Sequence, residues 1–457
     1  MVHLLERESH RWETTRLTPE QAWFFKVACF HEVEKAGFGP LRPRVSQNSL
    51  PYMYCTVKAK CFHTGLRTCC DPTHSCFRKI VSYAGMEKAW RNLFRKVGRA
   101  TSLLILKIAP GDETMSLSTA AKDLCQQFAC LVHPVSPVVR CQRHGCGKVK
   151  NPLELVVADA GAMYEAVDSA LILESLSFFV QVARQLGYVG VAVVRSPKLR
   201  GFLVRHEHFQ HRFVDVVTFE CLQTIHALSL SQKYVCVGNA VFKQKTGVPI
   251  GGLLSKCQTS LLLCAEETIW KSQPLKRSNH GFPTALHWNQ QVASCRYVDD
   301  CISMSHMFCQ ACLLSALNLK SHVAFELQNH DPLGATWLDL AVDVHGVRFH
   351  IDLAQHEVEW IQGFAACPKK FRMLPFQGEI TPDAKARIRN AQARLIQVFL
   401  DPPGSNLVLA ARALHYFMDI WHRSGYPEAT VVKAWRRHLS NPTLSSLAAE
   451  WIPVCAN

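Results

Sequence analysis

Apolar and polar residues follow two spacings along this chain, one typical of strands and one typical of helices. Short apolar or alternating runs predict strands at 52–57, 79–83, 103–108, 153–159, 189–195, 295–298, 301–305, 336–344 and 346–353. Longer runs with apolar residues three and four apart predict helices at 18–36, 86–97, 164–186, 219–230, 253–270, 309–319 and beyond 381. This order predicts an α+β fold of packed layers.

The 457 residues and their 48% hydrophobic content are enough for about three domain-sized units with real cores. Pattern changes divide the chain into four segments. We predict a helical extension at 1–38, a small mixed lobe with a Cys/His-rich insertion at 39–150, a larger lobe of strands and helices at 151–345, and a helical segment at 346–457.

The chain is strongly basic, with 51 Lys and Arg against 36 Asp and Glu, a net charge of +15 and a pI near 9.1. Such an excess attracts polyanions because binding releases their counterions, so nucleic acid is the expected partner. The alternative on charge alone is a basic surface that only aids solubility.

The 20 cysteines do not by themselves indicate a disulfide scaffold. The first thirty residues contain no uninterrupted apolar core of a signal peptide, and the apolar stretch 171–194 is broken by charged and amide side chains. We therefore expect an intracellular protein with reduced thiols and no membrane association. Two Cys/His groups lack paired C-x-x-C spacing, so no zinc site is assigned: Cys61, His63, Cys69, Cys70, His74 and Cys76, and Cys125, Cys130, His133, Cys141, His144 and Cys146.

Three carboxylates are candidates for metal chemistry. Asp159 ends an apolar strand, while Asp299 and Asp300 lie between two strand-like runs, as at the tip of a β-hairpin. Nucleotidyl transfer uses two divalent ions, which prefer oxygen ligands. Asp159 alone could be a helix cap or turn residue, but two adjacent carboxylates in an apolar hairpin repel each other unless a cation neutralises them. Asp215 also follows a strand, but it lacks the aromatic residue that follows Asp159 by five positions.

The residues around these carboxylates resemble a known family. The string Arg296-Tyr297-Val298-Asp299-Asp300 resembles the Tyr-x-Asp-Asp signature of reverse transcriptases. The segments 159–164 and 242–255 resemble that family's first metal-binding motif and the segment that supports template and nucleotide. Together with 337–340, 51–58, 78–82 and, more weakly, 424–427, they are most similar to Penelope-like retroelement reverse transcriptases, which are relatives of telomerase.

The resemblance implies a right-hand polymerase with an antiparallel palm sheet packed on helices. The fingers would occupy 39–150, the palm 151–345 and a helical thumb 346–457, after the extension at 1–38. The implied activity is RNA-directed DNA synthesis from an RNA template, a DNA or RNA primer and deoxynucleotides. Two Mg²⁺ ions are the implied cofactors, with Mn²⁺ as an alternative. Nuclear residence fits a retroelement enzyme, and cytoplasmic residence stays open.

The resemblance also implies roles for single residues. Asp159 and Asp299 would bind both metals, the backbone carbonyl of Ala160 would help to hold the second, and Asp300 would assist. Lys58 and Arg78 would neutralise the incoming triphosphate. The alternative for these two cations is a solvated position on a surface strand.

Five further residues would contact or position the substrates. Tyr164 would exclude a ribose 2′-hydroxyl and so select deoxynucleotides, unless it is an ordinary core aromatic. Gln244 and Gly251 would contact the template-primer and the nucleotide, where glycine permits close backbone approach; Gln244 could instead be a surface strand residue. Leu338 and Asp339 resemble the primer grip, although a hydrophobic strand that ends in a hydrogen-bonded Asp would explain them too.

The sequence departs from the broader family in three respects. Ile250 stands where many reverse transcriptases have Gln, Lys79 replaces the usual Pro, and no Gly-Ile-Tyr…Tyr-Ile-Gly nuclease pattern follows the thumb. Two other functions stay open: a viral RNA-dependent RNA polymerase, which shares the two-metal palm, and a catalytically retired protein that binds nucleic acid.

Overall fold

The computed structural model describes part of the chain, namely Leu5, 9–22, 50–57, 77–83, 88–114, 120–132, 153–195, 199–206, Phe209, 211–338, 340–345, 348–353, Pro427 and Ala429. The chain divides into two compact units, each assembled from separated stretches of sequence. The first unit comprises 1–113, 160–279 and 316–326, and the second comprises 114–159, 280–315 and 327–457. These units cut across the expected segments 39–150 and 151–345, which stay predictions.

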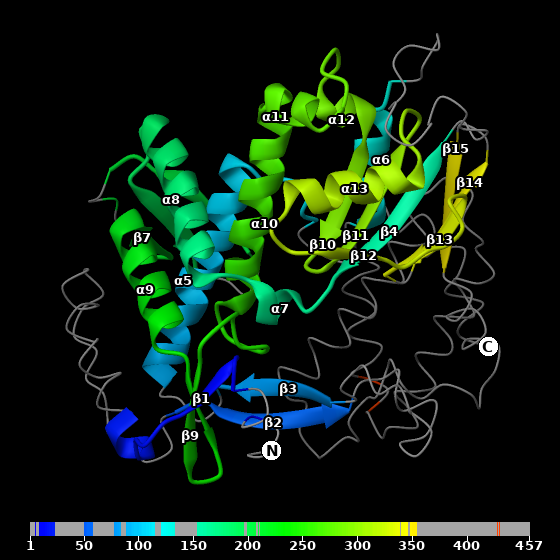
Figure 1. The fold of residues 1–457 in the computed structure, drawn as a ribbon. Coiled ribbons are helices and arrows are strands. Elements are labelled where there is room, and N and C mark those ends of the chain that lie inside the picture. The colour runs from blue at the N-terminus through cyan, green and yellow to red at the C-terminus, as the bar shows by residue number, and fades with distance from the viewer. Residues whose placement is uncertain are drawn as a thin grey trace, which may run out of the picture. The chain divides into compact units, whose positions relative to one another are not determined.

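The first unit contains a five-stranded sheet in the order β1-β9-β8-β2-β3 (Figure 1). Its strands are β1 (Trp12–Thr14), β9 (Ala240–Gln244), β8 (Tyr234–Val237), β2 (Tyr52–Val57) and β3 (Phe77–Ser82). Only the β2–β8 pair is parallel among the four strand pairs. Alternate residues of a strand point to opposite sides of a sheet. One face of this sheet is apolar, and its core cluster buries Leu5, Trp12, Met53, Val81, Val235 and Phe242.

Long helices form the second layer of this unit: α5 (Lys88–Ile108), α8 (Ser169–Gln185), α9 (Phe219–Ser231) and α10 (Ser255–Ser272). The buried His226 of α9 joins three of them, since Thr101 Oγ1 lies 2.8 Å from its Nε2 atom and Gln258 Nε2 lies 3.4 Å from its Nδ1 atom. Two short helices complete the unit, α7 (Met163–Ala166) and α11 (Pro274–Asn279).

Two sequence predictions in this unit are wrong. The strand expected at 103–108 is the last part of α5, where Leu103, Leu104 and Ile105 are all buried. A short apolar run fits a buried helix as well as a buried strand, so periodicity alone could not separate them. The single helix expected at 164–186 is divided after α7, and Asp168 caps α8 by accepting a hydrogen bond of 2.7 Å from the backbone N–H of Ala170.

A second sheet of the first unit has the order β6-β5-β7, with β5 (Gly190–Val194), β6 (Gly201–Val204) and β7 (Val214–Thr218) all antiparallel. This sheet packs on α5. At Gly201 the contact is so close that a Cβ atom would lie 2.6 Å from Leu103 Cδ1. One face of the small sheet therefore packs against the interior of the unit.

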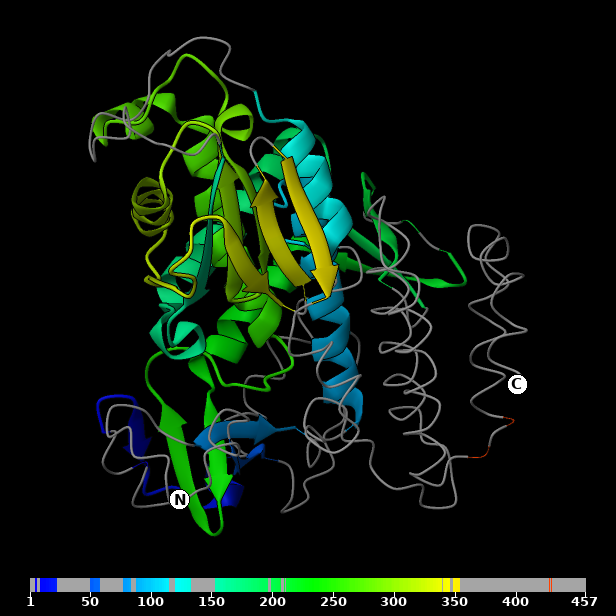
Figure 2. The ribbon, with the colours of Figure 1, turned by 90° about the vertical axis from the view of Figure 1, so that its right-hand side faces the viewer.

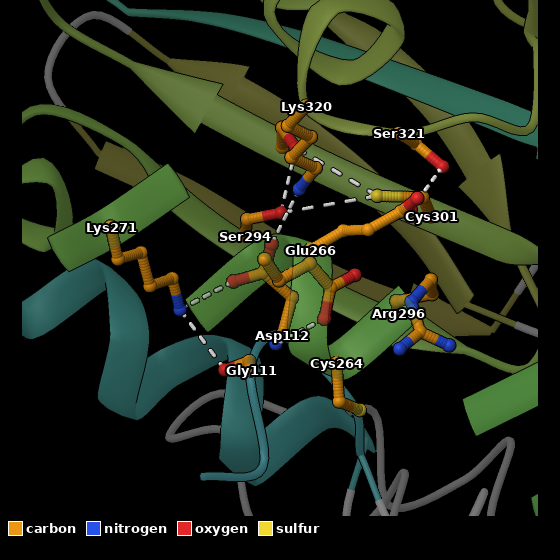
Figure 3. A network of polar contacts seen from close by, with 12 residues as sticks. Gly111, Asp112, Cys264, Glu266, Lys271, Ser294, Arg296, Cys301, Lys320 and Ser321 are labelled. Carbon is orange, nitrogen blue, oxygen red and sulfur yellow. Dashed lines mark hydrogen bonds and ion pairs between the residues drawn. The ribbon is translucent and has the colours of Figure 1, made fainter. Parts of the chain in front are cut away.

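A buried ion network stabilises the same unit (Figure 3). Asp112, which follows α5, accepts 2.6 Å contacts from the ammonium groups of Lys271 and Lys320. Lys271 also donates to the carbonyl of Gly111 at 3.0 Å, and Glu267 accepts a hydrogen bond of 2.8 Å from the N–H of Asp112. Burial would raise the pKa of Asp112, but the two lysines outweigh burial and hold this pKa well below its usual value. The network ties the turn after α5 to α10 and to the end of α13.

The second unit contains the sheet β10-β11-β4-β12 (Figure 2). Its strands are β10 (Ala293–Tyr297), β11 (Asp300–Ser305), β4 (Glu154–Ala160) and β12 (Phe325–Leu327). Helix α6 (Ala120–Ala129) packs against β10, and α12 (Trp288–Gln291) precedes it. Helix α13 (Gln310–Lys320) follows β11, and α13, β4 and β12 each continue from one unit into the other.

A three-stranded antiparallel sheet completes the second unit, with β13 (Gly334–Trp337), β14 (Leu340–His345) and β15 (Arg348–Leu353). The single strand expected at 336–344 is wrong, because the chain turns between Trp337 and Leu340, which pair across β13 and β14. The sequence there contains none of the Gly, Pro or Asn residues that usually mark a turn. Within the described residues, no helix is long and apolar enough to cross a membrane. The helices expected beyond 381 lie almost wholly outside the described residues.

Candidate active site

Two of the predicted carboxylates lie directly opposite each other on neighbouring strands. Asp159, near the end of β4, pairs in register with Asp300, the first residue of β11. Directly opposed residues of an antiparallel pair share one face of the sheet, with Cβ atoms about 4.5–5.5 Å apart. Both side chains are half-buried. Like charges in this arrangement destabilise a sheet unless something neutralises them.

The third carboxylate lies in a strained two-residue turn. Tyr297 and Asp300 pair across β10 and β11, so Val298 and Asp299 form the whole loop of the hairpin. Val298 has a φ of 61° and Asp299 has no positive φ, which is the type II′ arrangement. Glycine normally occupies the first of these positions, and a β-branched residue there costs about 1–3 kcal/mol. The strain is typical of a functional site, where the surrounding structure holds an unfavourable conformation.

Two buried side chains of the second unit support this turn. Arg296 is only 1% exposed, and its Nη1 atom donates a hydrogen bond of 2.9 Å to the carbonyl of Val298. Trp337 is fully buried, and its indole N–H points to the carbonyl of Asp300 at 3.4 Å. The carbonyl of Arg296 accepts a bond of 2.8 Å from the N–H of Thr114. Sequence reasoning quoted Arg296 and Trp337 only as parts of motifs and gave neither a role.

The carboxylate pair fits a hard divalent cation, because carboxylate oxygens are the ligands that Mg²⁺ prefers. Within the part of the chain that the structure describes, no group of three or more His, Cys, Asp or Glu side chains lies close enough together to hold a metal ion. Asp159 and Asp300 are thus brought together by the strand register, while the Asp299 side chain is not gathered with them. Ala160, the expected source of a carbonyl ligand, is the last residue of β4.

In the first unit, the segment between β9 and α10 is built by close backbone contacts. Gly247 has a φ of 71°, and a Cβ atom there would lie 2.3 Å from the carbonyl oxygen of Tyr164, which accepts a hydrogen bond of 2.7 Å from the N–H of Val248. Gly251 has a φ of 89°, and its Cβ atom would lie 2.7 Å from the carbonyl oxygen of Val81. The segment 245–252 therefore joins α7 to β3, and glycine is needed at both approaches. We call this segment the glycine loop.

Two polar side chains hold the glycine loop from within. The Nζ atom of Lys233 donates to the carbonyls of Gly247 and Lys245 at 2.9 and 3.2 Å and to Ser169 Oγ at 3.3 Å. Burial, with the charge of Lys243, lowers the pKa of Lys233 to about 8. Gln244 is 4% exposed and donates to the carbonyl of Thr246 at 2.9 Å. Sequence reasoning did not find Lys233, because its partners are backbone oxygens that carry no sequence signal.

The other predicted residues are described to different extents. Lys58 and Asp339 lie outside the described residues. Arg78 of β3 pairs with Thr56 of β2, and only the backbone of Arg78 is described. Tyr164 is half-buried in α7. Gln244 was expected to contact the template-primer, and its amide group is buried against the glycine loop.

The remaining candidates have structural partners or lie partly outside the described residues. Asp215 forms ion pairs with Arg195 at 2.8 Å and Lys96 at 3.4 Å in the small sheet, which agrees with the preference for Asp159. Leu338, with a φ of 58°, is the first residue of the turn between β13 and β14. Of the two Cys/His groups, the structure describes only Cys125 and Cys130.

No family model matches the sequence, and a search of curated proteins finds no match. Among solved structures, apo telomerase from Candida tropicalis is similar at a TM-score of 0.46 and 12% identity, over 93% of this chain and 66% of that chain. Telomerase from Candida albicans with a TWJ fragment of telomeric RNA has a TM-score of 0.45 and 13% identity, over 90% and 60%.

Another solved structure has a lower TM-score. An RNA-dependent RNA polymerase solved with vp4 and dsRNA has a TM-score of 0.35 and 11% identity, over 74% of this chain and 28% of that chain. The chain spans less than two thirds of the length of these telomerase chains. All of these TM-scores lie below 0.5, so the function of this mixed helix and sheet fold has to be argued from its own residues.

Proposed function

We propose that this chain is a template-directed nucleic-acid polymerase, and specifically a reverse transcriptase that adds deoxynucleotides to a primer 3′-hydroxyl on an RNA template. The observation that carries the proposal is the register of β4 and β11. It sets Asp159 opposite Asp300 and puts Asp299 next to this pair in a strained turn. A protein that only binds polyanions gains nothing from half-buried opposed carboxylates, which repel its ligand and each other.

In this proposal the segment 151–345 is the palm of a right-hand fold with fingers at 39–150 and a thumb at 346–457. Asp159, Asp299 and Asp300, with the carbonyl of Ala160, would hold two Mg²⁺ ions. These ions would supply activation of the primer hydroxyl and neutralisation of the triphosphate. Arg296 and Trp337 fix the backbone of the turn, and the Asp299 side chain would join the pair when metal is bound.

The residues of the first unit would act on the nucleic-acid and nucleotide substrates. Gly251 of the glycine loop would contact the nucleotide and the template-primer, on a side other than its Cβ direction, which faces the carbonyl of Val81 in β3. Lys233 keeps the loop in this conformation by three donated hydrogen bonds. Lys58 and Arg78 would neutralise the triphosphate, and Tyr164 would exclude the ribose 2′-hydroxyl.

Primer extension on an RNA template tests the proposal. The full chain with Mg²⁺ should extend a labelled DNA primer with deoxynucleotides, and Asp299→Asn should lower the rate at least about a hundredfold while duplex binding is retained. Asp343→Asn is the matched control, because Asp343 is an exposed carboxylate of β14 in the same unit. Its extension rate should equal that of the unchanged protein.

The other outcomes of this assay separate the alternatives. Extension with ribonucleotides in preference to deoxynucleotides would assign an RNA-dependent RNA polymerase. A protein that binds the duplex but extends with neither nucleotide, in Mg²⁺ or Mn²⁺, would be a nucleic-acid-binding protein, and the catalytic proposal would then be wrong. Tyr164→Ala refines the test, since it should increase ribonucleotide incorporation if Tyr164 contacts the sugar.

A further inference from the structure

A group of large hydrophobic side chains is exposed on the small sheet of the first unit. Phe202 of β6 is 42% exposed, Phe213, just before β7, is 55% exposed, and Leu199 and Phe209 are 38% and 36% exposed. Isolated exposed apolar residues are ordinary, but Phe202 and Phe209 contact each other, and all four residues lie in one short stretch of the chain. We call these four residues, with Arg205 and Arg212, the 199–213 patch.

The strand register directs Phe202 away from the interior of the unit. Gly201 faces α5 so closely that its Cβ atom would meet Leu103. Phe202 is the next residue of β6, so it points to the opposite face of the sheet. Across the strands Phe202 pairs with Ala192 of β5. The aromatic side chain is therefore on the face that does not pack on α5.

Aromatic rings of this stretch pair with one another or with cations. The Phe202 and Phe209 rings meet edge to face with centroids 5.4 Å apart. The guanidinium of Arg212 lies 4.9 Å from the ring centroid of Phe213, and that of Arg205 lies 5.2 Å from the ring centroid of Tyr188. Such pairs hold planar groups at the surface, where another planar group can stack on them.

The sequence that contains the patch is also rich in cations. The stretch 195–215 contains five cations, three histidines and two acids: Arg195, Lys198, Arg200, Arg205 and Arg212, then His206, His208 and His211, then Glu207 and Asp215. Asp215 is already paired with Arg195 and Lys96, so it does not offset the other cations of the patch. An occupant of this surface should therefore be anionic.

We propose that the 199–213 patch binds single-stranded nucleic acid, with bases stacked on the phenylalanine rings and phosphates held by Arg205 and Arg212. The combination of planar rings and guanidinium groups favours this ligand over an acidic protein, because every base offers a π-face and every nucleotide offers a phosphate. A duplex would offer phosphates but no free base faces. The inference concerns a surface separate from the carboxylates and does not depend on the polymerase chemistry.

Fluorescence anisotropy with a labelled oligouridine RNA and the full chain tests this inference. Photo-crosslinking of a 4-thiouridine oligonucleotide identifies which peptides it touches. Phe213→Ala should weaken oligouridine binding about 5- to 100-fold and remove the crosslinks to peptides of 199–213. Phe213→Tyr keeps an aromatic face and should bind within about twofold of the unchanged protein. Arg212→Ala should lower the slope of the logarithm of the binding constant against the logarithm of the salt concentration by about 1, as expected for the loss of one phosphate contact.

Leu275→Ala is the matched control, because Leu275 is an exposed apolar residue, 79% exposed, on α11 of the same unit. It should leave both readouts unchanged. The inference is wrong if Phe213→Ala binds and crosslinks as Leu275→Ala does, or if Phe213→Tyr loses as much affinity as Phe213→Ala. Asp299→Asn separates this result from the proposed function, since it should abolish primer extension but keep the crosslinks to 199–213.

Discussion

A methyl group added at Gly247 tests how tightly the glycine loop is built. The Cβ atom of Gly247→Ala would lie 2.3 Å from the carbonyl oxygen of Tyr164 and 2.7 Å from the Cα atom of Glu165. Both neighbours are backbone atoms, so no side-chain rotation can relieve the contact. The loop and α7 must separate by about an ångström to reach ordinary van der Waals distance.

Three contributions set the size of the effect. An alanine at a φ of 71° costs about 1–2 kcal/mol. Separation of the backbones breaks the 2.7 Å hydrogen bond from the Val248 N–H to the Tyr164 carbonyl, a loss of about 0.5–1.5 kcal/mol. Backbone shifts in a packed interior add about 1–3 kcal/mol. The free energy of unfolding should therefore fall by about 3–6 kcal/mol, a large part of the stability of a typical domain.

Gly238→Ala isolates the first of these contributions. Gly238 has a φ of 60°, but nothing lies within 4 Å of its Cβ position. This variant should lose only about 1–2 kcal/mol. Urea denaturation of both variants measures the difference, which should be about 2–4 kcal/mol. Primer extension on the same samples should show a raised KM for the deoxynucleotide in Gly247→Ala and not in Gly238→Ala.

Equal losses of stability in the two variants would refute the reasoning about close backbone approach. A second result would refute only the functional part. If Gly247→Ala is destabilised as expected but keeps the KM and kcat of the unchanged protein below its melting temperature, the glycine loop does not support the nucleotide.

Three further predictions concern single buried or strained residues. Val298→Gly should keep or raise the melting temperature, because glycine accepts a φ of 61°, but should slow primer extension by releasing the turn; a clear loss of stability would contradict this. Lys233→Met should lower the free energy of unfolding by about 2–4 kcal/mol in urea titrations, because three oxygens lose their donor, and a loss below about 1 kcal/mol would contradict it. Burial lowers the pKa of His226 to about 4, so as pH falls from 6.5 towards 4 the unfolded chain takes up the proton first and the stability decreases by about 3 kcal/mol. In thermal melts across this pH range, the melting temperature of His226→Gln should change less with pH than that of the unchanged protein.

The opposed carboxylates could be foreseen because strand patterns surround them. Alternating apolar residues on both sides of Asp299 and Asp300 allow one hairpin register, and a strand that ends at Asp159 can join it edge to edge. The structure has this register, with Asp159 opposite Asp300. Which carboxylates bind metal is a separate matter that register alone does not decide.

Other features could not be foreseen, for identifiable physical reasons. The run at Leu103–Ile105 is buried from several sides as helix, and an all-apolar run gives no period to recognise. The turn at Leu338 contains no Gly, Pro or Asn, and Asp339 alone is a weak signal beside the apolar residues around it, which favour one continuous strand. Lys233 and Arg296 act on backbone carbonyls, and such partners exist only once the chain has folded.

Backbone strain gives an independent indication of where the chemistry lies. Within the described residues, three non-glycine residues have a positive φ: Ala162, Val298 and Leu338. Each falls in a segment that resembles a reverse-transcriptase motif, two with the expected metal-binding carboxylates and one with the expected primer grip: Ala162 follows Asp159, Val298 precedes Asp299, and Leu338 precedes Asp339. Strain of about 1–3 kcal/mol at each position persists only where the surroundings impose it, and such positions cluster at functional sites. Side-chain identity and backbone conformation thus select the same three segments on separate physical grounds.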